Sequence, residues 1–138
     1  MNIEVYYFTK SGNTEKLAAA ISDEVSAAAK DLSIPLEKKA DILFLGSSVY
    51  AGGADSSVKE FIEKNADKIG TLAMFGSSAS GMSTYKKIKE IAEGKGIRVF
   101  EKFYNCPGHF LFMHKNRPGQ SDLEGAASFA RMVIDKSK

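Results

Sequence analysis

The chain has 138 residues, of which 43% are hydrophobic, and a chain of this size can bury the core of one domain spanning residues 1–138. Its 19 basic and 17 acidic residues give a net charge of +2, so we expect no nucleic-acid partner, which would require a clear basic excess. The sequence shows no signal peptide and no long apolar stretch, and its single cysteine, Cys106, cannot form an internal disulfide. We expect a cytoplasmic protein that is monomeric and has no membrane partner.

Short apolar runs alternate with segments of helical periodicity along the chain. Continuous apolar runs are typical of strands that are buried on both faces, and the intervening segments carry apolar residues three or four positions apart. The alternation predicts the α/β class, with a parallel sheet covered by helices on both faces. We expect strands at residues 3–8, 27–32, 41–46, 70–76 and 97–104, and helices at residues 14–26, 55–65, 84–93 and 121–134. The inner positions of these helices are Leu17, Ile21 and Val25; Val58, Phe61 and Ile62; Tyr85, Ile88 and Ile91; and Leu123, Ala127, Ala130 and Val133.

The strongest local signal is a hydroxyl-rich loop between the first strand and the first helix. In an open α/β sheet this loop lies at the carboxyl ends of the strands, where hydroxyl groups, a glycine and the free N–H groups of a helix start can hold a phosphate. Ser11 and Asn13 could instead act only as caps of the helix. No G-x-x-x-x-G-K-[ST] or G-x-G-x-x-G pattern is present, so the ligand would be a monophosphate. The candidate phosphate-binding residues are Thr9, Lys10, Ser11, Gly12, Asn13 and Thr14.

Residues 5–21 resemble the signature of the flavodoxin family. The signature combines an apolar strand end with small and hydroxyl residues at fixed spacing, and Thr9, Gly12, Thr14, Ala18 and Ile21 match it. The resemblance implies a single-domain, flavodoxin-like three-layer sandwich whose doubly wound, five-stranded parallel sheet has the order 2-1-3-4-5. It also implies one non-covalently bound FMN across the carboxyl ends of strands 1, 3 and 4.

Two further loops, after the third and fourth strands, are rich in glycine and small hydroxyl residues. A flavin ring needs an aromatic or apolar face to stack on, and Tyr50 is the candidate, although alone it could be an ordinary half-buried loop tyrosine. By the resemblance, the Ala51-Gly52 peptide can flip when the flavin is reduced and so favour the semiquinone, since glycine tolerates positive φ. The candidate flavin-binding residues are Ser48, Val49, Tyr50, Ala51, Gly52 and Gly53 in one loop, and Ser77, Ser78, Ala79, Ser80 and Gly81 in the other.

The resemblance implies an electron-transfer protein that shuttles electrons between redox partner proteins through the semiquinone and hydroquinone states of FMN. No catalytic residue is then required, because the flavin supplies the chemistry. The alternative is an FMN-dependent NAD(P)H oxidoreductase acting on quinones or other small acceptors, although no nicotinamide-binding motif is present. A signalling receiver would need acidic residues where Tyr7, Phe8 and Thr9 stand. A further alternative is a binding module that has lost its cofactor, which the intact loops disfavour.

Basic residues gather in the second half of the chain. From Lys86 to Arg117 there are eight basic and three acidic residues. This region could be an ordinary solvated face, or it could dock an acidic redox partner, either a reductase that donates electrons or an enzyme that accepts them. His109 and His114 lie in the same region, but two loop histidines without acidic neighbours make a poor metal site, so we expect no metal.

Overall fold

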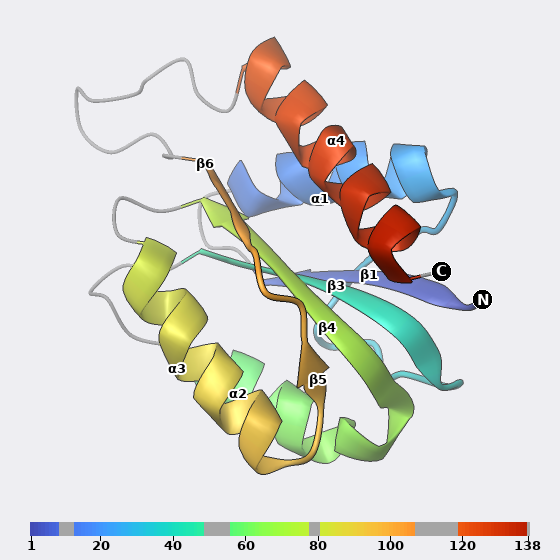
Figure 1. The fold of residues 1–138 in the computed structure, drawn as a ribbon, viewed down its shortest axis with the longest axis vertical. Coiled ribbons are helices and arrows are strands. Elements are labelled where there is room, and N and C mark those ends of the chain that lie inside the picture. The colour runs from blue at the N-terminus through green and yellow to red at the C-terminus, as the bar shows by residue number, and fades with distance from the viewer. Residues whose placement is uncertain (9–12, 49–55, 78–80, 107–118, 138) are drawn as a thin grey trace.

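The computed structural model describes residues 1–8, 13–48, 56–77, 81–106 and 119–137. They form a parallel sheet between two layers of helices (Figure 1). The strand order is β2-β1-β3-β4-β5, with β6 also paired with β4, which confirms the predicted order. The strands are β1 Ile3–Phe8, β2 Ala29–Asp31, β3 Ala40–Ser48, β4 Ile69–Ser77, β5 Arg98–Val99 and β6 Tyr104–Cys106. The helices are α1 Asn13–Val25, α2 Ser56–Lys64, α3 Gly81–Gly94 and α4 Gln120–Ser137, with a short 3-10 helix, η1, at Ala66–Lys68.

The sheet is buried on both faces, which explains the continuous apolar runs of its central strands. Alternate residues of β3 point to opposite sides, so Leu43 and Leu45 belong to the core under α2 and α3. Ile42 and Phe44 belong to the core under α1 and α4. Figure 1 shows the same division, with α1 and α4 on one side of the sheet and α2 and α3 on the other.

Three of the helices bury the apolar positions that the sequence predicts. In α1, Leu17 and Ile21 are fully buried, whereas Val25 is half-buried at the end of the helix. In α3, Tyr85 and Ile88 are buried and Ile91 is half-buried. In α2 the buried residues are the three predicted ones, Val58, Phe61 and Ile62.

Helix α4 differs from its prediction in both its start and its buried face. The helix begins at Gln120. The carboxylate of Asp122, in the first turn, accepts a hydrogen bond at 2.9 Å from the N–H of Gly119, the residue just before the helix, and so caps its start. The ring of Phe129 packs edge-on against Phe44 of the sheet, with centroids 6.4 Å apart, and this bulky contact sets the rotation of the helix. The buried residues are Asp122, Ala126, Phe129, Ala130 and Val133, whereas Leu123 and Ala127 are half-buried.

The predicted fifth strand, residues 97–104, is interrupted. β5 pairs with Thr71 and Leu72 of β4, and β6 pairs with residues 75–77, so residues 100–103 stand opposite only two residues of β4. The Tyr85 hydroxyl donates to the carbonyl oxygens of Phe100 and Glu101, both at 3.1 Å, and its ring stacks on Phe103. These contacts from α3 draw the chain out of the sheet and produce a bulge.

Gly46, near the end of β3, allows α1 to approach the sheet. A Cβ atom at this position would overlap the ring of Phe75 and would lie 2.8 Å from the Thr14 methyl group in the first turn of α1. The start of α1 therefore lies directly against the end of β3 only because residue 46 has no side chain.

We predict that Gly46→Ala lowers the free energy of unfolding by about 1–3 kcal/mol, because the added methyl group overpacks the contact between α1 and β3. Gly94→Ala is the matched control, since a Cβ at Gly94 would meet no atom within 4 Å, and it should leave the stability unchanged or raise it by up to about 1 kcal/mol. Urea unfolding followed by circular dichroism measures both variants. A Gly46→Ala variant as stable as the wild type would contradict the close packing.

Candidate functional site

The carboxyl ends of β1, β3 and β4 lie side by side and form one rim of the sheet, which we call the strand rim. Phe8 at the end of β1 is in register with Ser47 of β3, and Ser48 of β3 is in register with Ser77 of β4. β2 lies on one side of β1 and β3 on the other, so the strand rim includes the point at which the strand order reverses. In open α/β sheets, ligands bind at this point.

Several predicted site residues lie on the strand rim or at helix starts next to it. Asn13 and Thr14 form the start of α1, Gly81 is the first residue of α3, and Ser48 and Ser77 end their strands. The structure therefore brings the start of the first helix together with the ends of the third and fourth strands. The remaining predicted site residues, 9–12, 49–53 and 78–80, lie outside the described residues.

Thr14 is the predicted site residue with the best-defined surroundings. Its side chain is fully buried in the first turn of α1, and its methyl group faces the end of β3. The first turn of a helix presents backbone N–H groups without intrahelical partners and a positive dipole end, both of which favour an anion. Thr14 thus places a hydroxyl-bearing residue at the helix end that is suited to a phosphate.

Tyr7 links this first turn to β1. Its hydroxyl donates a hydrogen bond to the Glu15 carboxylate at 3.3 Å. Burial raises the pKa of Tyr7, and the negative charge of Glu15 raises it further, so the phenol keeps its proton at neutral pH. The bond joins the first turn of α1 to the sheet.

Ser47 is a rim residue that the sequence reasoning missed. The residue is only 6% exposed, and its hydroxyl has no hydrogen-bond partner among the residues that the structure describes. By strand alternation its side chain lies on the face covered by α2 and α3, as those of Leu43 and Leu45 do. A buried hydroxyl without a partner is unfavourable, so this position is suited to a polar atom supplied from outside the core. Because side chains alternate along a strand, the positions of Leu43 and Leu45 could have placed Ser47 on the same buried face.

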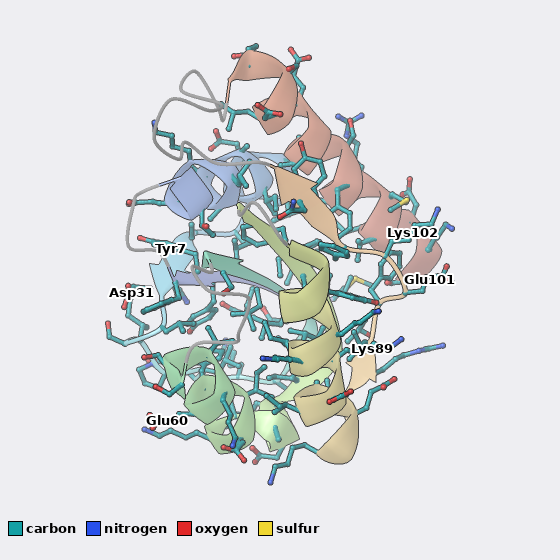
Figure 2. The ribbon with its side chains drawn as sticks, turned by 90° about the vertical axis from the view of Figure 1, so that its left-hand side faces the viewer. Tyr7, Asp31, Glu60, Lys89, Glu101 and Lys102 are labelled. Atoms are coloured by element: carbon teal, nitrogen blue, oxygen red, sulfur yellow. The ribbon has the colours of Figure 1, made fainter. Side chains whose placement is uncertain are left out.

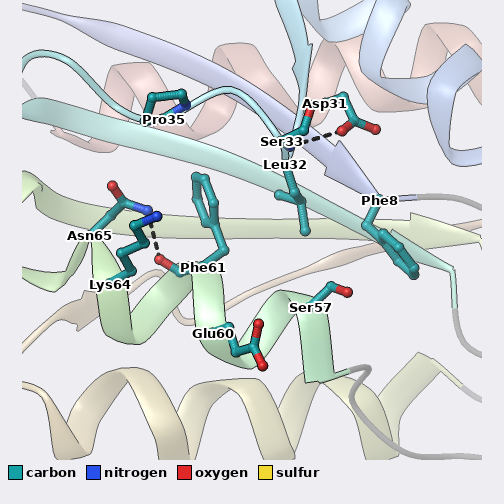
Figure 3. A pocket seen from close by; sticks show the side chains of 10 residues that line it. All are labelled: Phe8, Asp31, Leu32, Ser33, Pro35, Ser57, Glu60, Phe61, Lys64 and Asn65. Carbon is teal, nitrogen blue, oxygen red and sulfur yellow. Dashed lines mark hydrogen bonds between the residues drawn. The ribbon is translucent and has the colours of Figure 1, made fainter.

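A groove of about 410 Å³ lies beside the strand rim, between α2 and the chain that follows β2 (Figure 3). Figure 3 shows Leu32 pointing between Phe61 and Phe8, which form the apolar part of the wall. Asp31 accepts a hydrogen bond from the Ser33 N–H, and the Asn65 amide donates to the Phe61 carbonyl, so these polar groups already have partners. The predicted site residues are not among those that line the groove.

No group of three or more His, Cys, Asp and Glu side chains gathers anywhere in the described part of the chain. His109 and His114 lie outside the described residues. Of the four helices that the structure describes, none is long and apolar enough to cross a membrane.

The sequence matches the family model of the flavodoxin domain over residues 4–126. The chain belongs to this family, and the strand order agrees with the membership. No curated protein sequence matches the chain.

Solved structures of flavodoxins and other flavoproteins share the fold. An archaeal flavodoxin is 21% identical, with a TM-score of 0.82 and 99% of each chain covered. A flavodoxin described as WrbA-like, from Agrobacterium tumefaciens, is 17% identical, with a TM-score of 0.76 over 99% of this chain and 96% of that one. A flavoprotein in complex with FMN, from Lactobacillus acidophilus, is 17% identical, with a TM-score of 0.64 over 75% of this chain and 91% of that one. The chain therefore has the flavodoxin fold.

We predict that Ser47→Ala leaves the free energy of unfolding of the ligand-free protein unchanged or raises it by up to about 1 kcal/mol, because it removes a buried hydroxyl that has no partner among the described residues. The control is Ser22→Ala, which removes the hydrogen bond from the Ser22 hydroxyl to the Ala27 carbonyl and should cost about 0.5–1.5 kcal/mol. Urea unfolding measures both variants. A loss at Ser47 as large as that of the control would show that its hydroxyl is already bonded in the ligand-free protein.

Proposed function

We propose that the chain binds one FMN non-covalently at the strand rim and carries electrons between redox partner proteins. The observation that supports this function best is the meeting of the α1 start with the ends of β3 and β4 at the point of strand-order reversal. In a chain of the flavodoxin family, this arrangement suits a ligand with a phosphate at one end and a ring at the other.

The described residues fit the phosphate end of FMN. The backbone N–H groups of the first turn of α1, which have no partners within the helix, and the buried Thr14 would hold the phosphate without a cation. Residues 9–12 would complete this loop. The first turn also carries Glu15, but the hydrogen bond from Tyr7 engages its carboxylate.

The described residues also fit a polar ligand beyond the phosphate. The Ser47 hydroxyl, buried at the strand rim, would gain a partner when a polar ligand occupies the site. Tyr50 as the stacking residue, and the Ala51-Gly52 peptide as the group that responds to reduction, remain predictions. When bound, FMN supplies the one-electron chemistry, and the protein supplies position and surroundings.

We predict that Thr14→Val raises the dissociation constant of FMN by about 10- to 100-fold, because it removes a hydroxyl that bonds a charged phosphate and keeps the shape of the side chain. Riboflavin, which lacks the phosphate, is the matched control ligand, and its dissociation constant should change by less than about twofold. Quenching of flavin fluorescence measures both constants. Equal losses for FMN and riboflavin would show that Thr14 does not bind the phosphate.

The carrier function predicts that FMN stays bound through gel filtration and that stepwise reduction with dithionite produces the long-wavelength band of a one-electron-reduced flavin. NADPH or NADH alone should not reduce the bound flavin. Rapid reduction by either nucleotide would favour the alternative, an oxidoreductase acting on quinones or other small acceptors. Failure to retain FMN would overturn the proposed site but would leave the fold unchanged.

A further inference from the structure

Six cationic side chains lie on α3 and the chain that follows it, and one of them, Lys95, forms an ion pair with Glu63. Lys86, Lys87, Arg98 and Lys102 are exposed, and Lys89 is half-buried with its ammonium 5.9 Å from the centre of the Tyr85 ring. Within the described part of the chain, none of the other five forms an ion pair. We call these residues the basic surface: Lys86, Lys87, Lys89, Arg98 and Lys102.

We propose that the basic surface docks an acidic redox partner protein, an inference that rests on the proposed electron-carrier function. Figure 2 shows Lys89 and Lys102 on one side of the molecule and Asp31 and Glu60 on the opposite side. Between residues 86 and 102 there are six basic and three acidic residues, although the whole chain has a net charge of only +2. Such an asymmetric distribution orients an approaching protein of opposite charge.

The two segments that carry the basic surface are held together by Tyr85. Its hydroxyl bonds to the carbonyl oxygens of Phe100 and Glu101, and its ring stacks on Phe103 with centroids 4.6 Å apart. Lys102 therefore lies in a bulge that is anchored to α3. A surface whose backbone is held in position loses less conformational entropy on docking than a free loop would.

The charges of α3 are arranged against the preference of a helix. A helix is stabilised by acidic residues in its first turn and basic residues in its last turn. The other three described helices each have at least one such charge, such as Glu15 in α1 and Lys64 in α2, whereas α3 has neither. Its lysines lie in its middle turns, beyond the reach of the helix dipole, and Glu93 stands in its last turn. These lysines therefore do not stabilise the ends of the helix.

Lys86 and Lys87 are the part of the basic surface that lies close to the proposed flavin site. α3 begins at Gly81, directly after the loop predicted to contact the flavin ring. At 1.5 Å of rise per residue, Lys86 and Lys87 lie only about 8 Å along the helix from this start. The positive end of the α3 dipole lies at this start as well. A partner bound here would face the site from which electrons leave.

A nucleic acid fits the same surface less well. Glu90 and Glu93 lie on the exposed face of α3, and Glu101 is exposed beside Lys102. A polyphosphate backbone requires a continuous basic track, whereas a protein with interspersed charges can match both signs. The observations therefore favour an acidic protein.

The first experiment titrates the full ¹⁵N-labelled chain, incubated with FMN, with poly-L-glutamate and records amide chemical shifts. Shifts should concentrate at residues 85–89 and 98–102. The triple variant Lys86→Gln, Lys87→Gln, Lys102→Gln should weaken binding by at least about fivefold. The matched control, Lys38→Gln, Lys39→Gln, Lys59→Gln, removes the same charge from exposed lysines elsewhere and should weaken it by less than about twofold.

The same variants are then compared in the oxidation of the reduced, FMN-loaded protein by ferricyanide and by tris(phenanthroline)cobalt(III). Oxidation by the anion should slow as ionic strength rises, and the basic-surface variant should lose most of this salt dependence, whereas the control variant keeps it. Oxidation by the cationic cobalt complex should not slow with salt.

Poly-L-glutamate shifts spread over the whole chain, or equal effects of the two triple variants, would overturn the docking surface. Tighter binding of a single-stranded oligonucleotide at the same residues would assign the surface to nucleic acid instead. If FMN does not bind but the shifts appear as expected, the electron-carrier function fails while the docking of an acidic protein remains supported.

Discussion

The parallel pairing of β1 with β3 is the constraint on which the rest of the structure depends. β2 follows β1 in the chain and pairs with its other side, so the connections through α1 and through α2 run in opposite directions along the sheet. Since such connections are right-handed, α1 and α2 must cover opposite faces. The helices that follow β1 and β3 therefore lie on opposite faces of the sheet, with the strand rim between them. The site is a consequence of topology before any side chain is considered.

Small residues occupy the strand rim, where the proposed ligand would lie. Gly46 admits Thr14, and a side chain at Gly76 would collide with the carbonyl of Ser47. Ser47 itself adds a hydroxyl that has no partner among the described residues. The middle of the same strands carries larger apolar residues such as Leu43 and Leu45. Small residues are therefore confined to the strand ends. Local departures from good core packing are expected at functional sites.

Most of the fold could be predicted from the sequence because strands buried on both faces leave continuous apolar runs. The break in the fifth strand could not, because it depends on Tyr85, whose hydroxyl bonds to carbonyl groups 15 and 16 residues further along the chain. The buried face of α4 likewise depends on Phe129 meeting the sheet. At the candidate site, the composition of the loops located the strand ends and helix starts. Ser47 was missed because composition does not show that its side chain is buried or that its hydroxyl has no partner among the described residues.

The strand rim and the basic surface are built on different physical principles, so the proposed cofactor site and the proposed docking surface can be altered separately. The strand rim depends on backbone groups and buried small residues, where a single added methyl group disturbs the contact between α1 and β3. The basic surface depends on exposed side chains attached to a scaffold held by Tyr85. Exchanging Lys86 or Lys87 alters the field around the molecule without touching the core. On this scaffold the proposed docking surface can therefore change its charge while the contacts that form the strand rim stay the same.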